Sequence, residues 1–187
     1  MKGKTYPEKS RSSRPQAVLS RRLAVSGLFE LLKLKPYSDI TISDICEQGG
    51  ISRQTFYRNF TCKEEIVQYY IHHLMRCFID QAEGIMEKDL YAFFLSMPLT
   101  PELLTLLRRN HLMYLLRDSM LDLIALFMQT DRYRAHLSLE GYRSYHAAFL
   151  ADTLISILDT WADRDFTDST EDLYQIVLLF LAGSVRT

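Results

Sequence analysis

The chain has 187 residues, of which 48% are hydrophobic and 24% charged, with only seven glycines and five prolines. This size and composition predict a globular, mostly helical protein and exclude a low-complexity chain. The net charge of −1 divides into +7 over residues 1–63 and −8 over residues 64–187, so the N-terminal part favours a polyanionic partner such as nucleic acid.

Residues 1–14 carry five basic side chains against one acid, Glu8, with no apolar periodicity, which predicts a flexible basic arm. An arm that follows phosphates or enters a minor groove and a merely solubilising tail both fit this pattern. Pro15 is expected to begin a helix that ends before Pro36, because the residue before a proline is pushed away from the α conformation. The apolar stripe of this helix comprises Val18, Leu19, Leu23, Leu28, Leu31 and Leu32.

Residues 41–48 are predicted to form a short helix. Thr41 is a suitable N-cap, since its hydroxyl can accept from the backbone N–H near Asp44. Three apolar residues fall on one side of the helix at i, i+3 and i+4: Ile42, Ile45 and Cys46. Gly49-Gly50 then provides the sharp bend of a helix-turn-helix, because glycine tolerates positive φ.

A second short helix follows, capped by Ser52 and anchored from behind by Phe56 and Phe60 at i, i+4. Its remaining side chains point outward: Arg53, Gln54, Thr55, Tyr57 and Arg58. Arginine can make two hydrogen bonds to guanine, glutamine can do the same to adenine, and hydroxyl groups can donate hydrogen bonds to phosphate. An ordinary hairpin with a solvated polar face is the alternative, but the mutual consistency of caps, turn, aromatics and donors favours DNA binding.

These residues together resemble the N-terminal domain of TetR-family transcriptional regulators over residues 16–75. The resemblance rests on Lys35-Pro36-Tyr37, Ile40-Thr41-Ile42-Ser43-Asp44-Ile45, Gly50-Ile51-Ser52-Arg53, Thr55-Phe56-Tyr57, Phe60 and Lys63-Glu64. Two positions depart from it: Thr61-Cys62 replaces a frequent proline and cap, and Gln54 replaces a small residue.

The resemblance implies an all-α homodimer with an N-terminal three-helix helix-turn-helix domain, a C-terminal helical bundle and about nine helices in total. The domains expected are an arm at 1–14, a DNA-binding domain at 15–62, and a dimerisation and effector-binding domain at 63–187. The resemblance further implies that phosphates meet Thr41, Thr55, Tyr57 and Lys63, and that Arg53, Gln54 and Arg58 lie near bases. Ser52 belongs to the same DNA-binding surface.

A long amphipathic helix is predicted from Lys63 to about Glu83, with acids in its first turn. The family resemblance implies that this helix transmits effector binding to the DNA-binding domain, because its shift would change the separation of the two recognition helices in a dimer. Further helices are expected at residues 87–97, 100–110, 111–129, 141–163 and 169–185, the third being strongly apolar.

Large apolar and aromatic residues of the C-terminal part are candidates for a hydrophobic effector pocket. They are Phe78, Phe93, Met97, Met113, Tyr114, Phe127, Tyr142 and His146. The alternative is a solid core, because methionine and aromatic residues fill ordinary cores equally well.

The last two predicted helices carry more apolar surface than one small chain can cover, which predicts a four-helix interface across a two-fold axis. The residues expected in this dimer interface are Phe149, Leu154, Ile157, Trp161, Ile176, Val177 and Phe180.

The sequence offers no constellation for catalysis, so we expect no enzyme, no cofactor and no metal. His72 and His73 are adjacent and diverge on a helix, and no nucleotide-binding or nucleophile motif is present. The three cysteines, Cys46, Cys62 and Cys77, lack a Cys-x-x-Cys spacing and predict reduced thiols. The absence of a bilayer-length apolar run or a signal-peptide core predicts a cytoplasmic protein with no membrane partner.

The resulting hypothesis is a sequence-specific transcriptional regulator, preferably a repressor, that binds a pseudo-palindromic duplex as a homodimer. A small hydrophobic effector in the C-terminal domain would control its DNA affinity. The alternative is a TetR-like coactivator whose C-terminal domain binds a partner protein instead.

Overall fold

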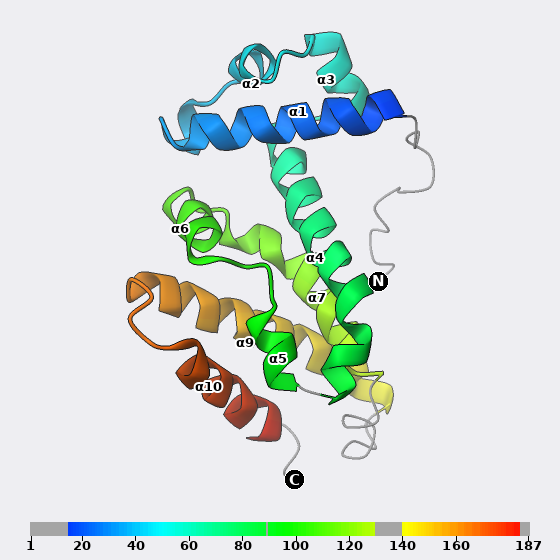
Figure 1. Ribbon diagram of the computed structural model, residues 1–187, viewed down its shortest axis with the longest axis vertical. Helices are drawn as coiled ribbons and strands as arrows, with labels where there is room; N and C mark the ends of the chain where they lie inside the picture. The colour runs from blue at the N-terminus through cyan, green and yellow to red at the C-terminus, as the bar shows by residue number, and fades with distance from the viewer. Residues whose placement is uncertain (1–14, 89, 130–139, 184–187) are drawn as a thin grey trace. The chain divides into compact units, whose positions relative to one another are not determined.

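The computed structural model describes residues 15–88, 90–129 and 140–183, so the predicted basic arm lies outside the described residues. Every regular element in those ranges is helical, which confirms the predicted all-α fold (Figure 1). The chain divides into two compact units, Met1–Tyr70 and Ile71–Thr187. The long helix α4, Lys63–Lys88, contributes residues to both units and extends past the predicted end at Glu83.

The first unit contains α1 (Pro15–Leu32), the short 3-10 helix η1 (Tyr37–Asp39), α2 (Ile42–Gln48), α3 (Arg53–Asn59) and the start of α4. Helix α1 packs against both α2 and α3, and these two helices also contact each other (Figure 1). The side chains without exposed surface at this centre are Ala24, Leu28, Ile45, Phe56, Ile66 and Val67. They form one small core, which fixes the position of α3.

The predicted apolar stripe of α1 is wrong in its N-terminal half, since Leu19 and Leu23 are exposed. The face that packs against α2 is centred on Gly27 and Leu28 instead. A Cβ atom at Gly27 would lie 2.9 Å from the backbone nitrogen of Gly49, so the two backbones are in close contact. The small size of Gly27 therefore decides which face of α1 packs against α2. A pattern of large apolar residues does not predict this face.

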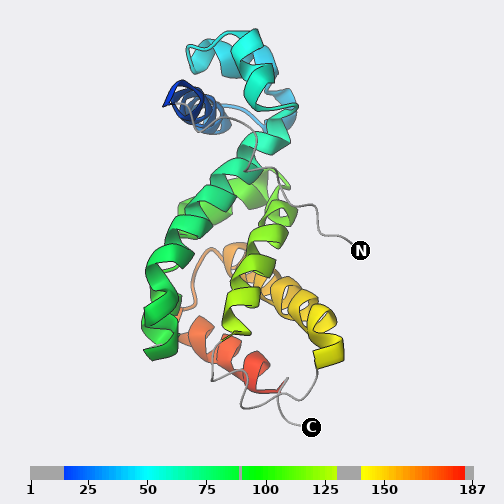
Figure 2. The same ribbon diagram turned by 90° about the vertical axis from the view of Figure 1, so that its right-hand side faces the viewer.

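The second unit contains the rest of α4, α5 (Leu90–Leu95), α6 (Pro101–Arg109), α7 (Arg117–Phe127), α9 (Arg143–Asp163) and α10 (Thr170–Gly183), with 3-10 helices η2 (Met113–Leu116) and η3 (Glu140–Tyr142). Helix α9 contacts α6, α7 and α10 (Figures 1 and 2). Its neighbours supply the fully buried side chains Leu104, Leu107, Leu116 and Met120. α9 is thus the central helix of this unit.

Two predicted helix starts in this unit are confirmed by capping contacts. The Thr100 hydroxyl accepts from the Leu103 N–H, and Pro101 occupies the first turn of α6. Before α10, the Ser169 hydroxyl accepts from the Asp172 N–H at 3.1 Å, while the Asp172 carboxylate accepts from the Ser169 N–H at 3.2 Å. This reciprocal pair is a capping box, and it fixes the start of α10 at the predicted position.

The predicted single helix over residues 111–129 is wrong, because η2 precedes α7 there. His111 has a φ of +57°, a left-handed conformation that ends α6 and reverses the chain. The Leu112 N–H then donates to the Leu107 carbonyl at 2.8 Å, which closes the turn. Residues 87 and 88, predicted in the next helix, belong to α4.

Ion pairs connect α9 to the helices around it. Arg117 Nε lies 2.8 Å from Asp152, and Arg108 pairs with both Asp159 and Asp163. These groups are partly exposed, so each pair adds little free energy. None of the described helices is both long enough and apolar enough to cross a membrane.

Candidate nucleic-acid interface

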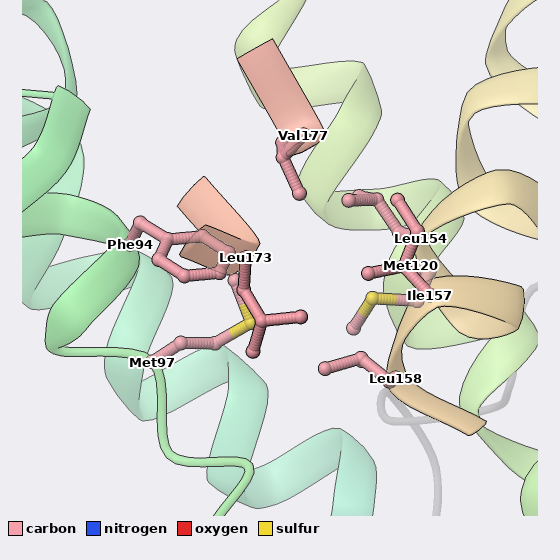
Figure 3. A pocket seen from close by; sticks show the side chains of 8 residues that line it. All are labelled: Phe94, Met97, Met120, Leu154, Ile157, Leu158, Leu173 and Val177. Carbon is pink, nitrogen blue, oxygen red and sulfur yellow. The ribbon is translucent and has the colours of Figure 1, made fainter. Parts of the chain in front are cut away.

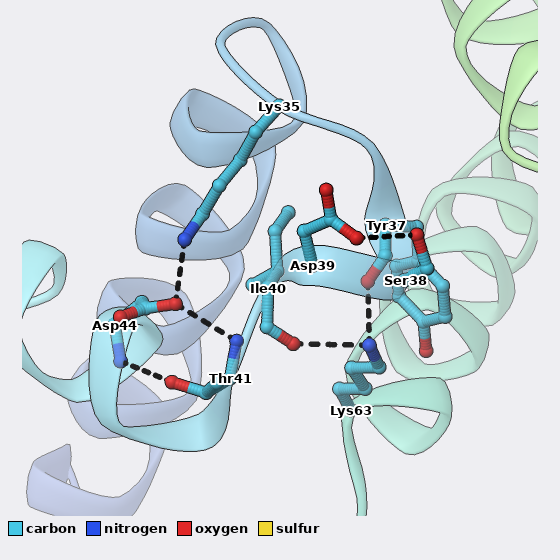
Figure 4. A network of polar contacts seen from close by, with 8 residues as sticks. All are labelled: Lys35, Tyr37, Ser38, Asp39, Ile40, Thr41, Asp44 and Lys63. Atoms are coloured by element: carbon cyan, nitrogen blue, oxygen red, sulfur yellow. Dashed lines mark hydrogen bonds and ion pairs between the residues drawn. The ribbon is translucent and has the colours of Figure 1, made fainter.

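Helix α2 begins at a reciprocal cap. The Thr41 hydroxyl accepts from the Asp44 N–H at 3.2 Å, and the Asp44 carboxylate accepts from the Thr41 N–H at 2.9 Å (Figure 4). This geometry confirms the predicted N-cap and satisfies two backbone donors at the start of the helix.

A lysine outside the helix strengthens the same cap. Lys35 Nζ donates to the Asp44 carboxylate at 2.7 Å (Figure 4). This bond, with the backbone and side-chain interactions of Thr41, lowers the pKa of the Asp44 carboxyl from 3.8 to about 2. Asp44 is therefore ionised at neutral pH and can accept both hydrogen bonds of the cap.

Two glycines form the turn between α2 and α3, and each is required for a different reason. A Cβ atom at Gly49 would lie 2.6 Å from the carbonyl oxygen of Leu23, so this position has no room for a side chain. Gly50 has no atom near its Cβ direction, but its φ is +62°. The first glycine permits close packing on α1, and the second permits the reversal of the chain.

We expect Gly49→Ala to lower the free energy of unfolding by about 1–3 kcal/mol, because a backbone atom cannot move away from the added methyl group. Gly50→Ala should cost about 1–2 kcal/mol through φ alone, and Gly50→Asn less, since asparagine tolerates the left-handed region. Guanidinium-induced unfolding followed by circular dichroism measures all three. Equal losses for Gly50→Ala and Gly50→Asn would show that φ is not the constraint at this turn.

Helix α3 is capped at one end and anchored along its inner side. The Ser52 hydroxyl accepts from the Thr55 N–H at 3.1 Å, as predicted. Phe56 is fully buried and Phe60 nearly so, with their ring centroids 5.9 Å apart. Phe60 also packs edge-on against Tyr69 of α4. The inner side of α3 is thus held by aromatic contacts.

The opposite side of α3 presents the predicted polar groups to solvent. Arg53, Gln54, Tyr57 and Arg58 are exposed, Tyr57 by 53%, while Thr55 is half-buried. Thr41 and Ser52, at the N-caps of α2 and α3, are also exposed. The first unit therefore combines several hydrogen-bond donors and two guanidinium groups on one short helix.

Lys63, at the start of α4, lies differently from the other predicted phosphate contacts. Its Nζ donates to the carbonyl oxygens of Tyr37 at 2.5 Å and Ile40 at 3.0 Å (Figure 4). The ammonium also lies 4.1 Å from the centroid of the Tyr37 ring. In this arrangement Lys63 attaches α4 to the segment that precedes α2.

Three further contacts around α3 were not predicted. Arg21 of α1 donates to the Asn59 side chain at 3.4 Å, and Asn59 donates to the Thr55 carbonyl at 2.8 Å. Arg53 donates through Nη2 to the Ser43 hydroxyl of α2 at 2.7 Å. The Arg21–Asn59 and Arg53–Ser43 contacts join residues of different helices, so no local spacing could have indicated these partners.

The predicted effector residues do not gather around one chamber. A cavity of about 10 Å³ in the second unit is lined by Phe94, Met97, Met120, Leu154, Ile157, Leu158, Leu173 and Val177 (Figure 3). Met97 is the predicted residue found there. Tyr114 and Tyr142 are 61% and 63% exposed, Phe78 is buried, and Met113, Phe127 and His146 are half-buried. The side chain of Phe93 lies outside the described residues.

The predicted dimer residues do come together on α9 and α10. An open groove of about 660 Å³ between these helices is lined in part by Phe149, Ile157, Trp161, Ile176 and Phe180. The other two, Leu154 and Val177, line the small cavity of Figure 3 instead. Polar side chains of Asp152, Arg164 and Asp168 border the groove.

Two capped helices that meet at a diglycine turn, the second bearing exposed arginine and glutamine, define a helix-turn-helix domain. Residues 25–70 match the family model described as bacterial regulatory proteins, tetR family. The matched segment contains α2, α3 and parts of α1 and α4, so the helix-turn-helix of this chain is similar in sequence to the DNA-binding domain of that family.

The chain is similar to the HTH-type transcriptional regulator AlkX of Mycobacterium tuberculosis (strain ATCC 25618 / H37Rv), with 29% identity over 89 residues. That match covers 48% of this chain and 39% of the relative. Among solved structures, the TetR family repressor AlkX from Dietzia sp. strain DQ12-45-1b aligns with a TM-score of 0.41 and 19% identity. This alignment covers 84% of this chain and 96% of the other.

Proposed function

We propose that the chain is a cytoplasmic transcriptional repressor that binds a pseudo-palindromic operator as a homodimer. The observation that carries this proposal is the exposed donor face of α3, held from behind by the buried Phe56. Each copy would place α3 in a major groove, with half-site centres about 34 Å apart or a multiple of that distance. Occlusion of polymerase at the bound promoter would then repress transcription.

The proposed contacts divide by chemistry. Arg53, Gln54 and Arg58 would read base edges, because guanidinium and amide groups make paired hydrogen bonds to purines. The hydroxyls of Thr41, Ser52, Thr55 and Tyr57 would donate to phosphates. Lys63 has three N–H donors, of which two are directed at carbonyls, so a third is available for a phosphate.

The homodimer would form through the apolar groove of α9 and α10. Phe149, Ile176 and Phe180 are exposed there, and such a patch on a small chain marks an interaction surface. In an isologous contact, the same groove of a second copy would cover these side chains. Two copies of α9 and α10 would then make a four-helix interface.

The small interior cavity bears on how the protein would be controlled. About 10 Å³ is room for one water molecule, whereas small-molecule pockets measure several hundred cubic ångströms. An effector at this place would have to displace side chains such as Met97 and Met120. The small volume of this cavity therefore favours the second candidate function, a coactivator-like role. In that role, a partner protein would bind the part of the apolar groove that a second copy leaves uncovered.

Selection of fragments from the organism's own genome tests the proposal directly. The purified full chain should retain fragments that share one two-fold symmetric motif, and it should slow duplexes containing this motif on a gel. In vitro transcription from the adjacent promoter should fall as protein is added. Retention without a shared motif would contradict sequence-specific regulation.

We expect Gln54→Ala to change the base preference at one position of the motif by about 1–3 kcal/mol. The matched variant is Tyr57→Phe, which removes one phosphate donor and should weaken binding to all sequences equally. Binding of the full chain to a panel of single-base operator variants measures both effects. An unchanged profile for Gln54→Ala would reject Gln54 as a reader, and a selective loss for Tyr57→Phe would contradict its phosphate role.

A further inference from the structure

The guanidinium of Arg53 is held by a side chain from the neighbouring helix. Arg53 is the first residue of α3, and its Nη2 lies 2.7 Å from the hydroxyl oxygen of Ser43, the second residue of α2. Both residues are exposed, so this contact lies on the same surface as the proposed DNA-binding groups. One helix of the motif therefore determines where a reading group of the other lies.

Ser43 lies in the first turn of α2, which is held in place by its N-terminal cap. The residues on either side of Ser43, Thr41 and Asp44, form the reciprocal cap, and Lys35 adds a 2.7 Å bond to Asp44. The charge of Arg53 also opposes the rise that burial causes in the pKa of the Cys46 thiol on α2. The side chain of Arg53 thus contacts α2 and is not extended freely into solvent.

A guanidinium has five N–H donors, and the bond to Ser43 uses one of them. The remaining donors can still make a bidentate contact with a purine edge. Fixing a long side chain before binding reduces the freedom lost when the complex forms, and it also restricts which base pair the group can reach. Arg58 is held differently, by the Thr55 hydroxyl of its own helix at 3.3 Å.

We infer that Ser43 is a positioning residue for base recognition: its hydroxyl orients Arg53 toward one base pair of the operator half-site. This inference rests on the proposed function and extends it from the recognition helix to the helix before it. Ser43 itself need not touch a base or a phosphate. Its contribution to selectivity passes through Arg53 alone.

The experiment compares the base preferences of full-length variants selected on a pool of randomised duplexes. Ser43→Ala should relax preference at the same base pair as Arg53→Ala, by about threefold to tenfold, with other positions unchanged. Ser43→Thr keeps the hydroxyl and should retain the wild-type profile. The double variant should match Arg53→Ala, because removal of the guanidinium leaves Ser43 nothing to orient.

Ser38→Ala is the matched control, since it removes another exposed serine hydroxyl of the same unit, bonded to Asp39 at 2.8 Å. It should leave the profile unchanged, and circular dichroism should show equal melting for all variants. A uniform loss of affinity in Ser43→Ala would indicate a phosphate contact and overturn the inference, as would an unchanged profile. A wild-type chain that enriches no motif would overturn the proposed function as well, so the two failures are distinguishable.

Discussion

Phe56→Ala is expected to lower the free energy of unfolding of the N-terminal unit by about 3–5 kcal/mol, the range for removing a buried aromatic side chain. Phe56 has no exposed surface and packs against both Tyr57 and Phe60. Its removal leaves a cavity at the centre of a unit made of only a few short helices. The polar contacts of α3 with α1 and α2 are exposed or only partly buried, so they compensate little for the lost aromatic packing.

The measurement has to separate this unit from the rest of the chain. Hydrogen exchange of peptides from residues 15–70 reports opening of the first unit. The single tryptophan, Trp161, lies in the second unit, so its fluorescence follows that unit during denaturation. Phe56→Ala should remove protection from the first set of peptides and lower DNA affinity, whereas Tyr57→Phe should change stability by less than about 0.5 kcal/mol.

A loss below about 1 kcal/mol in Phe56→Ala would mean that α3 is held mainly by polar contacts. The candidates would then be the Asn59 bonds to Arg21 and to the Thr55 backbone. The result therefore distinguishes an aromatic anchor from a hydrogen-bonded one, and either outcome assigns a physical cause to the position of the recognition helix.

The features of the first unit that the sequence predicted correctly are those decided by nearby residues. Thr41 and Ser52 cap their helices through the backbone three residues ahead. Phe56 and Phe60 are one helical turn apart, so their common burial follows from helix geometry alone. The two glycines end α2 because of conformation and size, which are properties of single positions.

The contacts that the sequence did not predict join separate elements. Lys35 reaches Asp44, and Ser43 receives Arg53, across nine and ten residues respectively. The Lys63 ammonium finds two carbonyls more than twenty residues earlier in the chain. Flexible side chains can reach many groups, and only the packed positions of the helices decide which group each one meets.

In the C-terminal unit, too, the sequence does not predict which elements contact each other. A pattern of apolar residues gives the face of a helix but not its neighbour, so the sequence makes Tyr114 and Tyr142 candidates for one effector pocket although both are exposed. The dimer residues were chosen from two consecutive helices, α9 and α10, that contact each other. Because consecutive helices that contact each other have few possible arrangements, most of the predicted dimer residues line the same groove.

Phe149→Glu combined with Ile176→Glu is expected to convert the proposed homodimer into monomers and to lower affinity for a two-half-site operator by about a hundredfold or more. Both side chains line the groove and are 54% and 39% exposed, so a single copy should accept the glutamates without unfolding. In a dimer, the same groups would be removed from water without a partner, which is strongly unfavourable for an ionised carboxylate. Affinity for a single half-site should change little, because α3 is untouched.

Sedimentation compares the variants with the wild type, whose dimer would have twice the 21.9 kDa mass of one chain. Leu179→Glu provides the matched control, since Leu179 is 70% exposed on the same helix but does not line the groove. It should remain dimeric with full operator affinity. A double variant that stays dimeric would place the interface elsewhere, and dissociation by Leu179→Glu alone would move it to the other side of α10. A monomeric wild type would leave the groove open to a different protein, which is the arrangement that the coactivator alternative requires.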